Sequence, residues 1–442
     1  MKGRFALLTL LLLGVNLLSG CAGIGEIDET AFVFTITFDK GEKAPYQIGT
    51  RIPVPRLLGR IQGQLAFSGD GQEPYINTQV QTHSLAEALV MTQLFTGREV
   101  SLDHARTIII SEDLARESIE DVCQPLLRGL EIRGTTLLYI SRGNAFRFIN
   151  ENKPLLEVNT SKFIELVSRE QNVHGLTTAM PLNLFYSTLA TEGAAVIPLA
   201  AINETVLAAA KAKEREPTAL TKDEQADREA KAEMSEEQAE ETGEKPPLRS
   251  VGSYLPGSIP RSGGNPIDFI GLAVFRNDKM VGVLDGNSAL VYNMLRNNFH
   301  RTIISVKMPR HPDETVSLLL YKGRPPRIRV EDAGTRYKIS VELVIDCDME
   351  TVSTGDRIRS VESLRDLETA VEKQLQQWVE TTISMTQEWG ADIFGFGNRL
   401  RSAFLTWDEW TRFNWSEAYK HAEVSVVITA NLRRTGLIIG TY

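Results

Sequence analysis

Residues 102–141, LDHARTIIISEDLARESIEDVCQPLLRGLEIRGTTLLYIS, decide the fold of the first half of the chain. The β-branched run at 107–110 predicts a strand over Leu102–Ser111 that is covered on both faces. A helix is predicted over Glu112–Leu130, and another strand over Gly134–Ser141. Because a helix between two such strands is typical of a crossover connection, the stretch predicts an α/β layer.

Similar elements surround this stretch on both sides. Strands are predicted at 31–38 and 46–54 as a hairpin, and helices at 84–97, 160–170 and 182–191, before an apolar run at 194–202. The helix at 84–97 opens with a capping box, in which Ser84 and Glu87 satisfy each other's free backbone donors. Residues 21–205 are therefore predicted to form an N-terminal α/β domain.

The composition changes after this domain. Between Lys211 and Arg249 there are twelve acidic and eight basic side chains, with few large apolar ones. Such a segment cannot bury enough surface to offset its ordering entropy. We expect a charged flexible linker over residues 206–250, with a partly helical segment as the alternative.

The second half of the chain predicts α+β architecture. Residues 251–300 are expected to form a middle domain, with a hairpin (269–275 and 280–284) and a helix (288–297). Residues 301–442 give strands at 302–308, 315–330, 337–345 and 424–430, and a long helix at 361–388. The apolar residues of this helix recur every three or four positions, so one face is expected to pack on an antiparallel sheet. The chain as a whole is predicted to be multi-domain, with mixed sheets covered by helices.

The first twenty-one residues form an export signal. Lys2 and Arg4 precede an apolar run that ends in Leu18-Ser19-Gly20-Cys21. This pattern predicts a lipoprotein: residues 1–20 are removed, and Cys21 carries an S-diacylglyceryl group and an N-acyl chain. The alternatives are an uncleaved anchor and a plain secretory signal. The run is shorter than the ~20 residues of a spanning helix, and bulky Leu18 fits a lipoprotein peptidase better than a plain signal. The mature chain is expected on the extracytoplasmic face of a membrane.

Charge and cysteine content exclude several classes of function. The formal charge is −9, and removal of Lys2 and Arg4 leaves 46 basic against 57 acidic residues, or −11. An acidic chain is a poor candidate for binding nucleic acid. Cys123 and Cys347 either form a disulfide or remain as two buried thiols, which is the favoured interpretation. No cysteine or histidine spacing predicts a metal site.

The search for catalytic residues gives one weak candidate. His104 lies beside Asp103 at the entrance to a strand, where a structural, hydrogen-bonded histidine is the favoured interpretation. No nucleophile elbow, phosphate loop or zinc-ligand pair is present. Gly395-Phe396-Gly397 is too short for a phosphate loop and is expected to let a helix change direction. Core packing, or else a partner surface, is expected for a group of aromatic residues: Phe404, Trp407, Trp410, Phe413 and Trp415. We therefore predict no catalytic residue, cofactor or metal.

Several stretches match a known family. They are Leu18–Cys21, Glu26-Ile27, Asp39–Gly41, Leu102–Ile110, Glu112–Arg116, Leu127–Arg133, Gly271–Phe275, Lys279–Leu284, Asp392–Gly397 and Arg433–Gly436. In their order and spacing the chain resembles the Ger(x)C family, the lipoprotein C subunits of the nutrient germinant receptors of spore-forming bacteria. It departs from the family in two places. Ala22-Gly23 stands where members commonly carry Trp-Asp, and the segment from Lys211 to Arg249 is longer than usual.

The resemblance implies a three-domain, non-enzymatic protein tethered to the inner membrane of the dormant spore. Its partners would be a multi-span B subunit similar to amino-acid permeases and an A subunit with its own spans. The receptor would sense amino acids, sugars or nucleosides, and whether this subunit touches the germinant stays open. The alternative function is a solute-binding lipoprotein that delivers a ligand to a transporter. That function requires two similar lobes, whereas the two halves of this sequence differ. A third alternative, an envelope hydrolase, would need a set of catalytic residues, and the sequence shows no such set.

Overall fold

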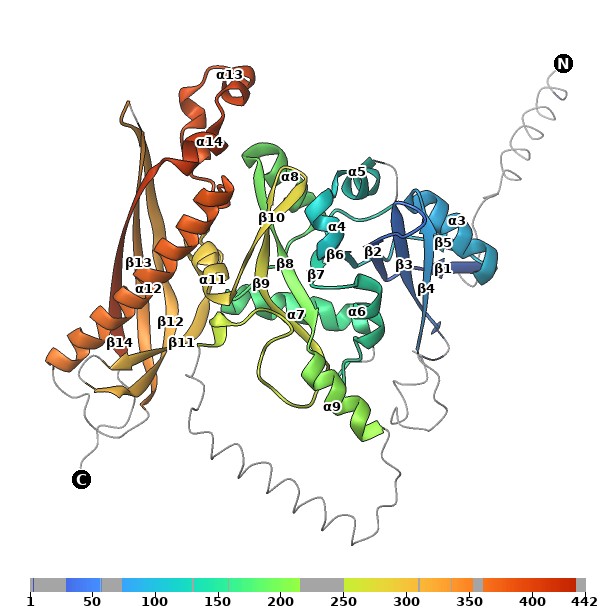
Figure 1. Cartoon of the computed structure of the whole chain (residues 1–442), viewed down its shortest axis with the longest axis horizontal. Coiled ribbons are helices and arrows are strands. Elements are labelled where there is room, and N and C mark those ends of the chain that lie inside the picture. Colours follow the sequence, from blue (N-terminus) through green and yellow to red (C-terminus); the bar gives the residue numbers. More distant parts are fainter. Residues whose placement is uncertain are drawn as a thin grey trace, which may run out of the picture.

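The structure is a computed structural model that describes residues 3, 29–55, 57, 74–128, 131–157, 159–214, 250–308, 311–334, 336–352 and 361–434. Cys21 and the segment 215–249 lie outside these ranges. Figure 1 shows a large helix-covered sheet and, beside it, a smaller sheet that carries one long helix. Within the described ranges, no helix is both long and apolar enough to cross a membrane.

The large sheet has eight strands in the order β10-β9-β8-β7-β6-β2-β3-β4. The strands are β2 (Thr35–Lys40), β3 (Tyr46–Pro53), β4 (Tyr75–Thr82), β6 (Thr107–Ser111), β7 (Leu137–Ser141), β8 (Ala194–Ile202), β9 (Ile267–Arg276) and β10 (Lys279–Leu284). The four central strands, β8, β7, β6 and β2, run parallel, and the outer pairs are antiparallel. Every residue of β6 is buried. The α/β layer predicted from residues 102–141 is thus confirmed.

Helices cover this sheet, and a small parallel pair of strands lies at its end. The helices are α3 (Leu85–Thr96), α4 (Glu112–Glu117), α5 (Glu120–Arg128), α6 (Ala145–Glu151), α7 (Thr160–His174), α8 (Leu182–Glu192), α9 (Glu204–Glu214) and α11 (Gly286–Leu295). The small pair is β1 (Thr30–Phe32) with β5 (Glu99–Ser101). The predicted cap of α3 is half confirmed. The Ser84 hydroxyl accepts from Glu87 N at 3.2 Å, but the Glu87 carboxylate accepts from His83 N, not from Ser84 N.

Two elements differ from the prediction around residues 102–130. The strand begins at Thr107, because the backbone at 102–105 forms a turn closed by the bond from Ala105 N to Leu102 O. The helix expected from Glu112 is broken at Ser118. The Ser118 hydroxyl donates to the Asp278 carboxylate at 2.6 Å and Ile119 N donates to Asp278 O at 2.9 Å. Asp278, in the turn between β9 and β10, thus accepts the hydrogen bonds that the chain donates where the helix is broken.

The predicted middle domain, residues 251–300, does not build a sheet of its own. β9 pairs antiparallel with β8, so the 269–284 hairpin extends the sheet of the N-terminal domain. The first residues of the predicted linker are helical as well. α9 continues to Glu214, and its Val206 and Leu207 are buried. The remaining domain boundaries stay predictions.

The small sheet confirms the predicted β-β-β-α-β order, with one correction. It consists of β11 (Arg301–Met308), β12 (His311–Asp332), β13 (Tyr337–Val352) and β14 (Glu423–Arg434), in that spatial order, and α12 (Val361–Trp389) precedes β14 in the chain. β14 runs parallel to β13, so the sheet is not wholly antiparallel as predicted. The reason is the crossover through α12, which returns the chain to the starting end of β13.

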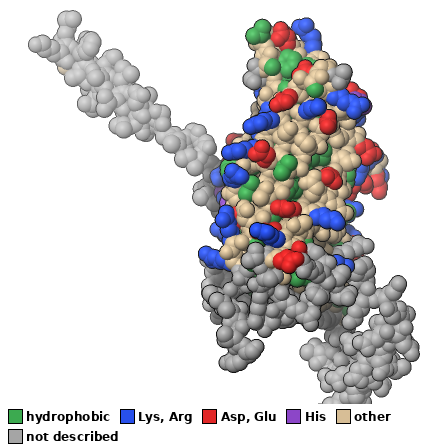
Figure 2. Space-filling view, turned by 90° about the vertical axis from the view of Figure 1, so that its left-hand side faces the viewer, with side chains coloured by type: hydrophobic (Ala, Val, Ile, Leu, Met, Phe, Trp, Pro, Cys, Tyr) green, Lys and Arg blue, Asp and Glu red, His purple; other side chains and the backbone are tan. Residues whose placement is uncertain are grey.

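The outer face of the small sheet is polar. In β11, exposed and buried residues alternate strictly, as expected for a strand with one solvated face. Figure 2 shows basic and acidic side chains intermixed over this side of the molecule, with only scattered apolar ones.

α12 packs between the two sheets. Of its six predicted apolar positions, Leu364 and Trp378 are half-buried, and the other four are buried: Leu367, Val371, Leu375 and Val379. The helix contacts β11 and β14 of the small sheet and also α11 and β10 of the large body. At Gly282 of β10 a Cβ atom would lie 2.3 Å from the Trp389 ring. The close approach of β10 to the end of α12 therefore requires glycine at this position.

Candidate functional site

The turn after α12 is organised by one buried carboxylate. Asp392 accepts hydrogen bonds from Gly397 N at 2.8 Å, Trp415 Nε1 at 2.8 Å and Phe394 N at 3.2 Å. Burial raises the pKa of Asp392, and the bonds from Gly397 and Trp415 act in the opposite direction. Gly395 has a φ of 73°, a left-handed conformation that glycine adopts without strain. Gly395-Phe396-Gly397 was predicted to let a helix change direction; α12 instead ends at Trp389, and Gly395 lies in the turn that follows.

An ion pair joins this turn to the large body. Arg296, at the end of α11, donates to the Glu192 carboxylate at 3.1 Å and to Phe394 O at 3.3 Å. Asn398 Nδ2 donates to the same Glu192 oxygen at 2.8 Å. Burial raises the pKa of Glu192, and Arg296 opposes that shift. The end of α8, the end of α11 and the 392–398 turn are held together by these groups, which we call the junction.

A cleft of about 760 Å³ opens beside the junction. It lies between the end of α8, the β9–β10 turn and two short helices, α13 (Trp407–Arg412) and α14 (Trp415–Lys420). Its charged lining has both signs, including Arg276, Glu417 and Lys420. Such a lining suits contact with a surface that also carries charges of both signs. Among the described residues of the cleft, no nucleophile is paired with a general base.

The aromatic group predicted at 404–415 divides into two parts. Trp415 is buried, as core packing predicts. Phe404, Trp410 and Phe413 are half-buried and pack against one another with ring centroids 5.1 to 5.8 Å apart. Phe404 and Phe413 are stacked, whereas Phe404 and Trp410 meet edge to face. Trp410, Phe413 and Trp415 line the cleft. The Trp407 side chain lies outside the described part of the structure.

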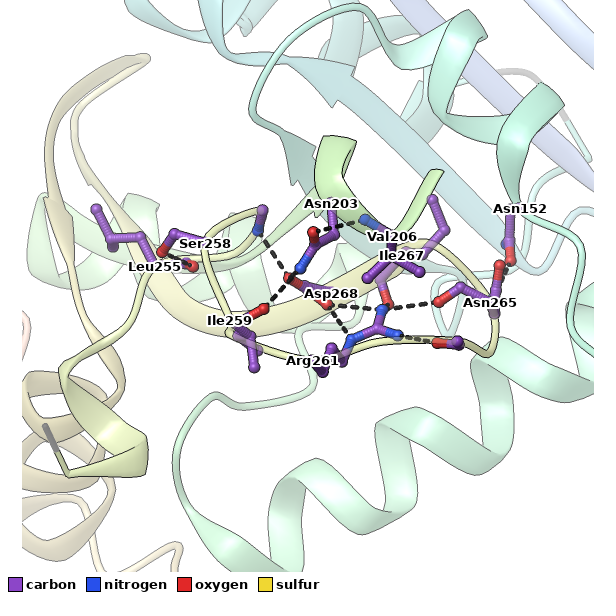
Figure 3. A network of polar contacts seen from close by, with 12 residues as sticks. Asn152, Asn203, Val206, Leu255, Ser258, Ile259, Arg261, Asn265, Ile267 and Asp268 are labelled. Atoms are coloured by element: carbon purple, nitrogen blue, oxygen red, sulfur yellow. Dashed lines mark hydrogen bonds and ion pairs between the residues drawn. The ribbon is translucent and has the colours of Figure 1, made fainter. Parts of the chain in front are cut away.

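A second polar network closes the base of α9 (Figure 3). The buried Asp268 carboxylate accepts from Arg261 Nε at 2.9 Å, Asn203 Nδ2 at 2.9 Å and Gly257 N at 3.1 Å. Arg261 also donates to the carbonyl oxygens of Gly263, Asn265 and Ile267. Asn203 accepts from Val206 N at the start of α9. This Asp268 network fastens the chain leaving the large sheet to the chain returning to it.

The Asp268 network gives a testable result for the charged segment. Replacing residues 218–244 with a Gly/Ser segment of equal length is expected to change the free energy of unfolding by less than about 1 kcal/mol. The reason is that both ends of the insertion are fixed by Asn203 and Asp268 independently of it. Urea unfolding measures this. A drop of several kcal/mol would show that the segment makes stabilising contacts, and Asp268→Ala provides the destabilised reference.

An apolar groove of about 620 Å³ lies near the Asp268 network. Phe163, Leu176 and Phe269 line it, and Leu155 and Leu156 at its edge are 74% and 102% exposed. A groove of this size and character could take an apolar small molecule or segment.

The structure gives His104 a packing role. Its exposed ring lies edge-on to Phe32, with centroids 4.5 Å apart. The two other cysteines are buried and free, so the favoured prediction of two thiols is confirmed. Burial raises the pKa of both Cys123 and Cys347 to about 12, which keeps these thiols protonated at neutral pH. In the described part of the chain, no group of three or more His, Cys, Asp or Glu side chains could hold a metal ion.

Sequence reasoning did not find the Asp268 network or the Glu192–Arg296 pair. Asp268 interrupts the apolar strand β9, which is a signal for a buried, paired charge. Asn203 precedes α9 directly and is a typical capping residue. Neither signal predicts that Asn203 and Asp268 bond to each other, because the two residues are 65 positions apart in the sequence.

Comparison with known families covers both halves of the chain. Residues 24–202 match the family described as "Spore germination protein N-terminal domain", and residues 270–436 match "Spore germination B3/ GerAC like, C-terminal". The chain belongs to the Ger(x)C family. The predicted resemblance is thereby confirmed. The match of the second half includes most of β9, the Asp392–Gly397 turn and all of β14.

Individual Ger(x)C relatives are distant in sequence but similar in length. YfkR of Bacillus subtilis (strain 168), a protein assigned to spore germination, is 25% identical over 96% of this chain and 95% of its own. Spore germination protein KC of the same organism is 22% identical over 99% of this chain and 97% of its own. A crystal structure of the GerBC protein aligns with 90% of this chain and 96% of its own, with a TM-score of 0.49 and 12% identity. A role in spore germination follows from the family.

Proposed function

We propose that this Ger(x)C protein is a non-catalytic lipoprotein subunit of a nutrient germinant receptor. Acyl chains on Cys21 hold it at the spore inner membrane, on the extracytoplasmic face, beside membrane-embedded A and B subunits. The observation that carries the proposal is the Leu18-Ser19-Gly20-Cys21 site, which precedes the folded body by only eight residues. Two or more acyl chains anchor a protein stably, at roughly 0.8 kcal/mol per buried methylene.

The tether gives a physical reason for assembly without a large interface. Confining the body to the bilayer raises its effective concentration beside membrane partners, so a modest contact suffices. The cleft at the junction offers charged groups of both signs and the rings of Trp410, Phe413 and Trp415 for such a contact. The catalytic candidate His104 packs on Phe32, which agrees with a non-enzymatic role.

The alternative is a solute-binding lipoprotein, for which the apolar groove beside Phe163 and Phe269 would be the binding site. The two sheets argue against it. One has eight strands and the other four, with different topology, so the described residues do not form the paired similar lobes of that class.

Affinity purification of the lipidated protein from spore membranes separates these functions. The expected result is co-purification of two membrane-embedded proteins, one of them similar to amino-acid permeases. The variant with Cys21→Ala, purified in the same way, provides the matched control. Recovery of a transporter together with a bound small molecule, and of no receptor subunits, would favour the solute-binding function and contradict the proposal.

A further inference from the structure

Helix α3 exposes an apolar face that nothing in the described structure covers. Val90 and Met91 are 56% and 42% exposed, and Leu94 and Phe95 are 82% and 55% exposed. These positions follow one another at i, i+1, i+4 and i+5, so they form one contiguous patch along the helix. The opposite side of α3 packs inward through Leu85, Ala88 and Thr92. A helix that is apolar on both sides is usually buried on both sides.

The one charged residue of α3, Glu87, borders the first end of this patch, three positions before Val90 and four before Met91. Glu87 is the acidic residue of the first turn, and its carboxylate accepts from the Thr82 hydroxyl at 2.7 Å and from His83 N at 3.1 Å. At 1.5 Å rise per residue, Leu94 lies about 10 Å further along the helix. The Leu94 and Phe95 end of the patch thus lies away from the one charge of its own helix.

The fold places the patch beside the point where the chain arrives from Cys21. Thr30, the first residue of β1, pairs with Glu99 of β5. Glu99 follows Phe95 by four residues, so the Cα atoms of Phe95 and Thr30 lie within about 20 Å of each other. Eight residues separate Cys21 from Thr30, and a chain of that length reaches at most roughly 30 Å.

We propose that the patch Val90, Met91, Leu94 and Phe95 rests on the bilayer in which Cys21 is anchored. The inference builds on the proposed lipidation, which keeps this end of the molecule near the membrane surface. A contiguous apolar patch on an exposed helix marks a membrane or protein contact, and the short tether selects the membrane. Contact through α3 fixes how the body stands on the bilayer, with the small sheet at the opposite end of the molecule (Figure 1).

The test uses the full lipidated protein on vesicles of phosphatidylethanolamine and phosphatidylglycerol, some with nitroxide groups on their acyl chains. Leu94→Cys carries an environment-sensitive fluorophore, and the buried Cys123 and Cys347 stay unlabelled. Leu405→Cys, at a position 93% exposed before α13, is the matched control. We expect the nitroxides to quench the label at position 94 at least about three-fold more than the label at 405.

Three results would overturn the inference. Equal quenching at both positions, on protein that stays vesicle-bound, rejects the α3 contact alone. Shielding of position 94 that develops only after solubilised spore-membrane proteins are added assigns the patch to a protein partner. If the lipidated protein without the cysteine substitutions does not bind vesicles at all, the anchoring through Cys21 is rejected as well. This outcome differs from the first, in which the protein stays bound to the vesicles.

Discussion

Cys21→Ala is expected to move the protein from the membrane fraction to the soluble fraction. The physical reason is that no described helix is long and apolar enough to cross a bilayer, and an acidic body gains little from anionic lipid. Loss of two or more acyl chains removes many times the roughly 0.8 kcal/mol that each buried methylene contributes. Nutrient-triggered germination through the proposed receptor should fall to the level of a strain without the protein. Fractionation of spore membranes and germination assays measure the two effects.

The thiol content supplies an independent readout of the same site. The chain has three cysteines, and Cys123 and Cys347 are free. A denatured, lipidated chain should therefore react with a thiol reagent at two positions, and an unmodified chain at three. In the native state, Cys123 and Cys347 should react slowly with the reagent at pH 8, because burial raises the pKa of both thiols to about 12. Ala22→Ser, which keeps Cys21, is the matched control. A third reactive thiol, or unchanged membrane retention of Cys21→Ala, would contradict the anchor.

Asp392→Asn is expected to lower the free energy of unfolding by about 2 kcal/mol, and Asp392→Ala by about 3 kcal/mol. Both carboxylate oxygens accept bonds from buried donors, so an amide nitrogen in place of either oxygen would face an N–H group. Alanine would leave Gly397 N and Trp415 Nε1 without their acceptor. Urea unfolding followed by tryptophan fluorescence measures the loss, since Trp415 itself reports on the turn.

The matched control for this experiment is Asp408→Asn. Asp408 is exposed in the first turn of α13, and its substitution should change stability by less than about 0.5 kcal/mol. The slope of the transition should stay the same in all variants if unfolding exposes the same surface. An Asp392→Asn protein as stable as the Asp408 variant would show that the carboxylate does not hold the junction.

Local patterns carried the successful predictions. The β-branched run of β6 and the three-to-four spacing in α12 depend on residues close in sequence, and both predictions were confirmed. β4 was missed because its sequence, YINTQVQT, is largely polar and half-buried. α6 was missed for a different reason. Its first backbone donors, Ala145 N and Phe146 N, are satisfied by Asp39 of β2, more than a hundred positions earlier.

By itself, the sequence determined the family, the α/β and α+β character of the two halves, and the lipoprotein prediction at Cys21. Each of these depends on motifs or on periodicity within a few turns of chain. Only the tertiary structure decided that β9 and β10 extend the large sheet, that β14 runs parallel to β13, and that α12 lies between two sheets. The hydrogen-bond networks of Asp392 and Asp268 were likewise decided only by the tertiary structure. Their bonds join segments far apart in sequence, and nothing in a local pattern specifies which distant donors will meet a buried carboxylate.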